Sequence, residues 1–532
     1  MVSSLALASG RFVRFVFVVF FVPFVLSGCE TPAYRNPIIF GDYSDPDVVR
    51  VGEDFYLVSS SFTAVPALPI LHSRDLVTWT IVGHAAPLLP SPRYDQPQHG
   101  MGVWAPSLRH HAGRFWVYYG DPDVGIFMTS AADPRGPWEP LTLVAAASGW
   151  IDPCPLWDDD GAMYLVHAWA KSRAGFNSVL TLRRLSADGR SLLAGDPVTI
   201  FDGTVRHPTI EGPKFYKRDG YYYVFAPAGG VANGWQTVLR ARTITGPYED
   251  RIVLRRGGSA INGPHQGGWV DTASGQSWFV HFQDRDAFGR IVHLQPMQWR
   301  DGWPVIGRDP DGDGIGEPVD AHPRPAGVGR SDDDAIQTSD DFSAGQLGLQ
   351  WQWQANPSPE WSSLAARPGY LRLAAQPAGS NLWSSPAVLL QKFPAEHFVA
   401  TASIDAASLA GDSSAGVVVF GMDYALIRAR KTPDGWLIEQ VVCRGADQSG
   451  PETVAATAPG AWQIDLRVSV AGSVAMFSYS LDHRRFHDLG DRFEIKPGRW
   501  VGAKVGLVAT RPASTPAGGY ADVDWFRVQI GL

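Results

Sequence analysis

Cysteine is scarce in this chain: there are three in 532 residues. Cys29 follows an apolar N-terminal run, and Cys154 and Cys443 lie far apart, so a disulfide framework is not indicated. Positive charge is also in deficit, because the formal net charge is −8. Nucleic-acid binding calls for a basic surface, so nucleic acid is excluded as a partner. No amphipathic helical period stands out, which argues against a helical fold.

Turn-forming and aromatic residues are abundant instead. The chain has 56 Gly, 41 Pro, 20 Trp, 16 Tyr and 26 Phe, and 45% of its residues are hydrophobic. This composition is typical of globular β-proteins with many turns. The length exceeds one ordinary core, so two or more domains are expected. Aromatic rings also suit the C–H faces of sugars, although most rings in such a chain belong to the core.

The N-terminus has the features of a secretion signal. Two arginines precede the apolar run 15-FVFVVFFVPFVL-26, and 27-SGC-29 follows it. We therefore predict a signal peptide over 1–28. The exit also resembles a bacterial lipobox, which predicts acylation of Cys29 and a secreted lipoprotein at the outer membrane or in the periplasm. A transmembrane helix is the alternative, but the run falls short of about 20 residues.

A unit of about 50 residues recurs five times. Each unit begins with an acidic or aromatic residue, continues into a strand and a turn, and then enters a second strand rich in Tyr, Phe or Trp. The spacings between successive unit starts are 59, 48, 59 and 54 residues. The repeat predicts a five-bladed β-propeller over 37–307. Its five starting residues, here called the head residues, should converge at one end of the central channel: Asp45, Trp104, Asp152, Glu211 and His265.

The rest of the chain reads as a linker and a second all-β domain. Residues 308–337 are rich in Gly, Pro and Asp and predict a linker. Short alternating strands over 338–532 predict a β-sandwich of the jelly-roll or concanavalin-like kind. The linker contains 309-DPDGDGIGEPVD-320, which is either a solvated Asp-Gly turn or an EF-hand-like calcium loop without flanking helices.

Three carboxylates on three blades point to a reaction. Hydrolysis of a glycosidic bond needs one carboxylic acid to protonate the leaving oxygen and a second carboxylate to activate water. A third carboxylate near the acid raises its pKa by like-charge repulsion. Asp45, Asp152 and Glu211 satisfy this requirement in number and in predicted position.

The motifs resemble glycoside hydrolase family 43. The resemblance rests on Asp45-Pro46, Asp152-Pro153 and Glu211-Gly212-Pro213, followed in order by 263-GPHQGG-268 and 289-GRIVHLQPMQW-299. Each motif alone is weak, but one per blade in the right order is a strong signal. The second domain resembles the sandwich of the β-xylosidase branch of that family.

The resemblance implies a role for each acid. Asp45 matches the general base, Glu211 the general acid, and Asp152 the residue that tunes the pKa of the acid and orients it. The implied mechanism is inversion, with base and acid about 6.5–9.5 Å apart to admit a water. Asp47 is then a structural residue, and Asp42 is expected to be solvated.

The resemblance also suggests substrate and metal residues. Arg290 matches an arginine that reaches the sugar pocket, Trp104 resembles an aromatic wall of it, and Phe62 is a candidate second wall. His265 matches a channel histidine associated with calcium or another cation held mostly through waters. No organic cofactor is expected.

The function implied is exo-acting β-1,4-xylosidase action on xylo-oligosaccharides. An α-L-arabinofuranosidase is the close alternative, because the two sugars present similar hydroxyls to a small pocket. A non-catalytic glycan-binding propeller is the alternative from another class. It predicts loss of at least one of the three acids, and none is lost. The family resemblance suggests that the sandwich packs on the propeller and lends a loop to the pocket, whereas the other possible role is that of an independent carbohydrate-binding module.

Overall fold

The computed structural model describes residue 1 and residues 33–329 and 335–531. Cys29 and all but the first residue of the predicted signal peptide lie outside the described residues. The described chain is almost entirely β-structure, with one short α-helix, α1 (Lys171–Ala174). Across the described ranges, the structure contains no helix whose length and apolar character would let it span a bilayer.

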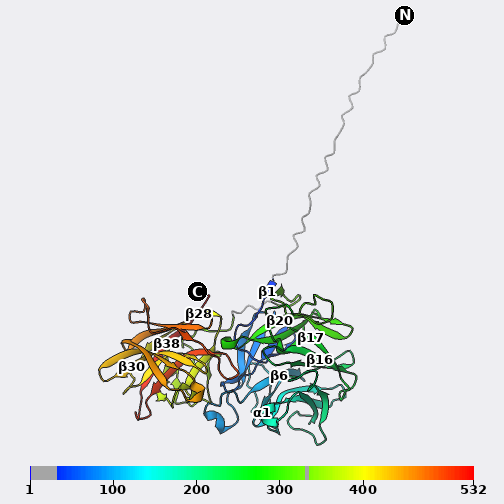
Figure 1. Cartoon of the computed structure of the whole chain (residues 1–532), viewed down its shortest axis with the longest axis horizontal. Helices are drawn as coiled ribbons and strands as arrows, with labels where there is room; N and C mark the ends of the chain where they lie inside the picture. Colours follow the sequence, from blue (N-terminus) through cyan, green and yellow to red (C-terminus); the bar gives the residue numbers. More distant parts are fainter. Residues whose placement is uncertain (2–32, 330–334, 532) are drawn as a thin grey trace. The chain divides into compact units, whose positions relative to one another are not determined.

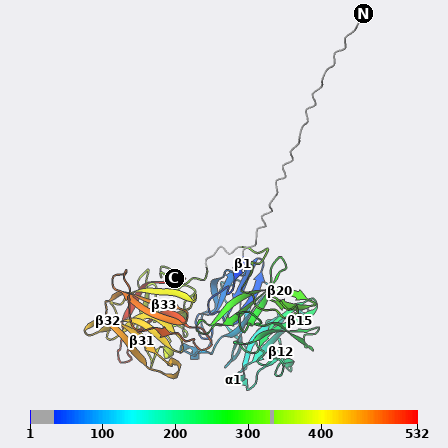
Figure 2. The same ribbon diagram turned by 45° about the horizontal axis from the view of Figure 1, so that its top comes forward.

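The N-terminal domain consists of five four-stranded antiparallel sheets arranged as the blades of a propeller (Figures 1 and 2). The all-β propeller predicted from the repeat is confirmed. The blades are β2 (Asp47–Val51), β3 (Asp54–Val58), β4 (Ala67–Ser73), β5 (Thr80–Ala86); β6 (Trp104–His111), β7 (Arg114–Asp121), β8 (Gly125–Ala131), β9 (Thr142–Ala146); β10 (Trp150–Trp157), β11 (Met163–Trp169), β12 (Val179–Leu185), β13 (Val198–Asp202); β14 (Lys214–Arg218), β15 (Tyr221–Ala228), β16 (Trp235–Ala241), β17 (Glu249–Leu254); and β18 (His265–Asp271), β19 (Ser277–Asp284), β20 (Arg290–Arg300), β21 (Trp303–Ile306).

Local turn chemistry sets the hairpins within each blade. Asp219 and Gly220 join β14 to β15 with φ values of 49° and 73°. A two-residue type I′ hairpin turn requires φ > 0 at both central positions, which Asp-Gly supplies at low cost. The register then places Arg218 opposite Tyr221.

The blades close into a ring through apolar packing between neighbours. Strand β2 contacts both β6 and β18, so the last blade meets the first. A separate buried cluster fills each of the five interfaces between successive blades. For example, Val48 and Phe55 of the first blade pack with Val280 and Leu294 of the last. This packing fixes the starts of the innermost strands relative to one another.

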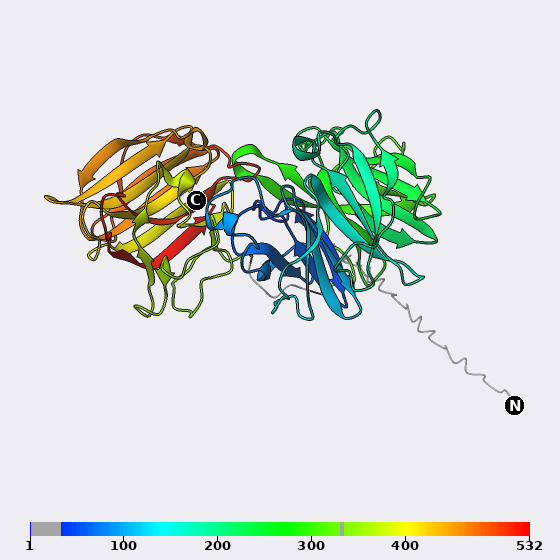
Figure 3. The same cartoon turned by 90° about the horizontal axis from the view of Figure 1, so that it is seen from below.

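The C-terminal domain is a sandwich of two eight-stranded sheets, yellow to red in Figure 3. The predicted sandwich is confirmed. One sheet runs β23 (Gln352–Trp353), β27 (Val388–Lys392), β37 (Lys504–Arg511), β29 (Ser414–Phe420), β30 (Tyr424–Thr432), β31 (Gly435–Cys443) and β32 (Glu452–Pro459), with β26 (Gln376–Pro377) beside β37. The other runs β24 (Ser362–Ser363), β25 (Leu371–Ala374), β38 (Tyr520–Ile530), β28 (His397–Asp405), β33 (Gln463–Ala471), β34 (Val474–Ser480) and β35 (His487–Asp488), with β36 (Phe493–Glu494) beside β34.

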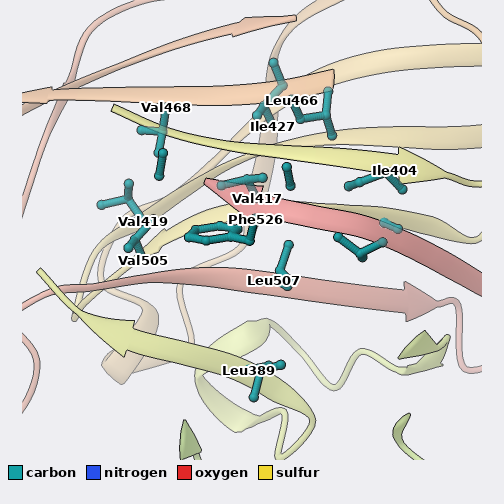
Figure 4. Packing of buried hydrophobic residues seen from close by; sticks show 14 of the residues in the cluster. Leu389, Ile404, Val417, Val419, Ile427, Leu466, Val468, Val505, Leu507 and Phe526 are labelled. Atoms are coloured by element: carbon teal, nitrogen blue, oxygen red, sulfur yellow. The ribbon is translucent and has the colours of Figure 1, made fainter. Parts of the chain in front are cut away.

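The sandwich core lies between these sheets (Figure 4). Val417 and Leu507 come from the first sheet, and Ile404, Leu466 and Phe526 from the second; all are at most 2% exposed. Alternate residues of each strand point inward, so the other residues of β28, β33 and β38 form an outer face.

The chain before the first blade is tied to the segment after the last. β1 (Ala33–Arg35) pairs with β22 (Ala321–Pro323) within the predicted linker. The remaining short helices are 3₁₀ turns: η1 (Pro92–Asp95), η2 (Asp286–Phe288), η3 (Leu382–Ser384) and η4 (Ala446–Gln448).

Candidate active site

Within two residues of the start of each innermost strand lies a residue with left-handed backbone, here called a kink residue. A non-glycine residue in this region carries about 1–2 kcal/mol of strain, and such strain clusters at functional sites. Four of the five kink residues precede a proline. The kink residues and their φ values are Asp45 (53°), Ala105 (33°), Asp152 (57°), Gly212 (57°) and Gln266 (32°).

The kinks give the true register of the repeat. Asp45 and Asp152 are themselves kink residues, whereas Trp104, Glu211 and His265 each lie one residue before one. The five head residues predicted from the sequence are therefore not strictly equivalent, although all lie at the starts of the innermost strands. The offset lets Glu211 and Asp152 reach the site from different backbone positions.

Asp45 is anchored by three donors. The hydroxyls of Ser44 and Ser60 donate to its Oδ2 at 2.9 and 2.6 Å. Arg290, at the start of β20, donates from Nη1 at 3.3 Å to Oδ1. The Asp45 residue is 5% exposed. A carboxylate held by donors on several sides has a fixed orientation, as a general base requires.

The electrostatic surroundings of Glu211 differ from those of Asp45. Burial, followed by the charges of Asp152 and Asp45, raises the pKa of its carboxyl to about 8, and the charge of Arg290 partly opposes this rise. Its side chain is still 29% exposed, so the acid can reach a ligand. At neutral pH the pKa keeps a proton on Glu211, as a general acid requires.

Asp152 interacts electrostatically with both of these acids. It is 2% exposed, and its Oδ2 accepts hydrogen bonds from the backbone N–H of Gly212 at 2.7 Å and from Gln266 at 3.3 Å. Because Gly212 directly follows Glu211, this bond fixes the backbone that carries the acid. Burial raises the pKa of Asp152 to about 7, with a smaller contribution from Asp45.

The other predicted substrate residues lie beside this group. The rings of Trp104 and Phe62 meet edge to face with centroids 6.3 Å apart. Trp104 is half-buried and Phe62 is 5% exposed. The guanidinium of Arg290 lies over the ring of Phe282, at 5.0 Å from its centroid. Arg290 also contacts Asp45 directly, as described above, and it lines a neighbouring cavity.

That cavity brings in residues that sequence reasoning missed. It has a volume of about 400 Å³ and is lined by Arg290 together with Met422 and the sandwich segment 497–501. Within this segment Trp500 is 53% exposed, and Arg499 packs so closely on Gly100 that a Cβ there would lie 2.5 Å from Arg499 Cγ. No local signal in the sequence marks this loop, because its partners are about 200 to 400 residues away.

The expectation that Asp42 is solvated is wrong. Asp42 is 3% exposed, and its two oxygens accept the backbone N–H groups of Arg290 at 2.9 Å and of Gly502 at 3.0 Å. It therefore connects the propeller strand that carries Arg290 to the sandwich loop. Asp47 is structural, as predicted: it is 0% exposed and forms a 2.6 Å ion pair with Arg109.

His265 lies deep in the site without a hydrogen-bond partner on either ring nitrogen. It is 1% exposed, and its Nε2 lies 3.7 Å from Glu211 Oε1. Burial, followed by the charge of Arg290, lowers its pKa to about 3, so the ring is neutral. Among the described residues, no group of three or more His, Cys, Asp or Glu is arranged to hold a metal. The neutral ring leaves a nitrogen lone pair that can accept a hydrogen bond from a water bound to a cation.

The carboxylates of the 309–320 loop do not point to one common centre, as an EF-hand-like calcium loop would require. Asp309 accepts the backbone N–H groups of Gly312 and Gly314, and its Oδ2 pairs with Arg300 at 2.7 Å. Asp313 pairs with Arg255 at 3.1 Å. These donors occupy oxygens that a calcium ion would need.

Comparisons with known proteins agree with this geometry. Residues 34–304 match the model of the glycosyl hydrolases family 43, and residues 339–529 match a β-xylosidase C-terminal concanavalin A-like domain. A putative β-xylosidase from Xylanibacter ruminicola is 40% identical over 90% of this chain and 86% of its own length. A non-reducing-end α-L-arabinofuranosidase from Bacteroides ovatus is 32% identical over 73% of each chain.

Solved structures agree as well. A variant of a family 43 protein from Bacillus licheniformis superposes with a TM-score of 0.82 at 27% identity, over 93% of this chain and 99% of that one. A xylan β-1,4-xylosidase from Bacillus halodurans gives a TM-score of 0.81 at 25% identity, over 93% and 99%.

Proposed function

Because the chain belongs to glycoside hydrolase family 43, we propose that it is an exo-acting, inverting β-1,4-xylosidase that releases terminal xylose from xylo-oligosaccharides. The observation that carries the mechanism is the contrast between Glu211, whose pKa is raised to about 8, and Asp45, which is held by three donors. The choice of xylose is supported by the relatives named β-xylosidase that cover 90% and 93% of the chain.

In this proposal the two acids act in one displacement. Asp45 takes a proton from water while that water attacks the anomeric carbon. Glu211 gives its proton to the glycosidic oxygen as the bond to the leaving sugar breaks. Arg290 and the Ser44 and Ser60 hydroxyls hold the base in place. The water ends on the sugar and the leaving group departs as an alcohol, so the anomeric configuration inverts.

Asp152 has a supporting role. It fixes the backbone beside Glu211 through Gly212 and, when ionised, keeps the pKa of Glu211 high. It is a positioning residue, because it acts through Glu211 and not on the sugar. Trp104 and Phe62 would supply apolar walls for the bound sugar.

Exo action is supported by the sandwich loop. Segment 497–501 and Met422 line the cavity at Arg290, so one side of the site is bounded by a second domain. A site that is closed on one side admits the end of a chain in preference to its middle. This arrangement favours release of terminal residues.

Arabinofuranosidase activity is the second candidate. It is favoured by the 32% identical relative that carries this activity in its name. The same acids and the same cavity would serve an α-L-arabinofuranosyl group, so the mechanism would be unchanged and only the preferred sugar would differ.

We further propose a bound cation near His265 and a lipid anchor at Cys29. Calcium held through waters near His265 would supply positive charge beside Glu211 and brace the channel. Secretion and acylation at Cys29 would place the enzyme on a bacterial membrane, as a lipoprotein of the outer membrane or periplasm. Labelling of cells with a radioactive fatty acid tests the anchor, because a Cys29→Ser variant should take up no label.

The decisive experiment compares 4-nitrophenyl β-D-xylopyranoside with 4-nitrophenyl α-L-arabinofuranoside. We expect faster hydrolysis of the xyloside, no activity in Asp45→Ala, and α-xylose as the first product in a proton NMR time course. Preference for the arabinofuranoside would move the assignment to the second candidate. β-Xylose as the first product would overturn the inverting mechanism.

A further inference from the structure

The outer face of the second sandwich sheet carries a trough of about 540 Å³. Its lining comes from β28, β33, β38 and two neighbouring loops, and it shares no residue with the cavity at Arg290. The function proposed above makes no use of it. Its chemistry nonetheless differs from that of an ordinary solvated sheet face.

The trough exists because the middle strand has small side chains. Thr401 and Ser403 lie on the outer face of β28, and their partners on β38 are Arg527 and Trp525. Small residues between taller neighbours leave a channel that follows the direction of the strand. The guanidinium of Arg527 lies over the Trp525 ring, 4.2 Å from its centroid, so the two side chains form one wall.

The opposite wall repeats this arrangement on β33. Arg467 is the partner of Thr401, donates to its hydroxyl at 3.0 Å, and stacks on Phe486 at 3.3 Å from the ring centroid. Asp465 is the partner of Ser403 and pairs with His483 at 3.0 Å. These contacts fix the wall in place before any ligand arrives.

Several polar groups in the trough are unused. Within the described chain, the side chains of Ser403, Asp524 and Arg527 make no hydrogen bond. They offer a hydroxyl, a carboxylate and a guanidinium in the space beside Trp525. A ligand with many hydroxyl groups can donate to the carboxylate and accept from the guanidinium.

The charges of the lining do not favour an anionic ligand. Three carboxylates face two guanidinium groups and one histidine, so positive charge is not in excess: Asp405, Asp465, Asp524, Arg467, Arg527 and His483. Aromatic faces beside donors and acceptors of near-balanced charge suit a neutral, hydroxyl-rich chain. In a glycoside hydrolase, the polymer that matches this description is the carbohydrate itself.

We propose that this trough binds a neutral pentose polysaccharide, of the xylan or arabinoxylan type, at a site separate from the catalytic centre. Binding there holds the chain near the active site and raises the effective concentration of its ends. The inference goes beyond the proposed activity, because it concerns a polymer and not the bond that is cleaved.

The test is affinity electrophoresis in native gels that contain soluble arabinoxylan, with dextran gels for comparison. All chains carry Asp45→Asn so that the polymer is not hydrolysed during the run. Trp525→Ala removes one wall, and Ser403→Tyr fills the floor of the trough while leaving the walls intact. The matched control is Trp462→Ala, since Trp462 is 45% exposed on the same domain and does not line the trough.

We expect arabinoxylan, but not dextran, to retard the parent chain. Trp525→Ala should weaken binding about tenfold, the effect of losing one anchoring aromatic contact. Ser403→Tyr should weaken binding at least as much, because its ring takes the space of the ligand, whereas Trp462→Ala should bind as the parent does. Equal retardation of all four chains, or no retardation of the parent, would overturn the proposal. So would a parent dimer in light scattering that Ser403→Tyr dissociates, because the trough would then bind a second copy. Hydrolysis of the aryl xyloside by chains with native Asp45 measures the proposed activity independently.

Discussion

Replacing Asp152 with asparagine should move the alkaline limb of the pH–activity profile to lower pH. The limb reports loss of the proton from the general acid, Glu211. Where Glu211 releases that proton, at a pKa of about 8, Asp152 is already ionised, because its own pKa is about 7. A neighbouring negative charge disfavours a second one, so removing it stabilises ionised Glu211 and lowers its pKa. The alkaline limb therefore moves to lower pH and not to higher pH.

The size of the effect follows from the order of the causes. The pKa of Glu211 rises from 4.5 to about 8, with burial as the largest cause, Asp152 second and Asp45 third. A charge at close range shifts a pKa by about 1–3. Since Asp152 ranks below burial, we expect its removal to lower the pKa by about 1, which corresponds to about 1.4 kcal/mol.

The assay is kcat against pH with xylobiose, whose leaving group needs protonation. Asparagine can still accept the Gly212 N–H bond, so the backbone beside Glu211 should keep its position. The matched control is Asp158→Asn, in the same blade as Asp152. It removes a carboxylate that is paired with Lys217 of the next blade and is not among the causes of the raised pKa of Glu211. An alkaline limb that stays at the same pH or moves to higher pH in Asp152→Asn would refute the reasoning, as would an equal shift in the control.

Three further predictions concern single residues. Glu211→Ala should slow xylobiose hydrolysis by about 10²–10⁴ and spare aryl xylosides, which need less protonation; equal loss on both substrates would rule Glu211 out as the acid. Asp47→Ala should destabilise the propeller by about 3–5 kcal/mol in urea unfolding, because Arg109 would keep an unpaired buried charge, and an unchanged midpoint would contradict this. Trp500→Ala should raise KM for xylobiose about fivefold, the scale of one aromatic contact of about 1 kcal/mol, because Trp500 lines the cavity with Arg290; an unchanged KM would place the loop outside the substrate site.

The repeat in the sequence was sufficient to predict the propeller and the meeting of its acids. Asp45-Pro46 and Asp152-Pro153 mark two strand starts, and Glu211 stands directly before the equivalent Gly212-Pro213. The spacing alone could not reveal this offset of one residue, because it becomes visible only in the backbone angles. Arg290 was predicted from its motif, but its direct contact with Asp45 depends on how the fifth blade meets the first.

The contribution of the sandwich lay beyond sequence reasoning. Asp42 precedes the first blade and accepts a bond from Gly502, 460 residues later. An aspartate near a strand start reads as a solvated turn residue when its partner is that distant. The loop 497–501 has no motif either, since its role arises from packing against Gly100 and Arg290.

The left-handed backbone at Asp45 and Asp152 has a consequence for protein engineering. Glycine at either position would relieve about 1–2 kcal/mol of strain, less about 0.5–1 kcal/mol of its own chain entropy. At Asp45 that gain is outweighed, because the buried Arg290 would lose its carboxylate partner. At Asp152 it adds to the removal of a carboxyl group whose charge burial disfavours. Libraries selected only for heat resistance should therefore enrich inactive chains altered at Asp152. A thermostable catalyst from this scaffold has to be selected for turnover and melting temperature together.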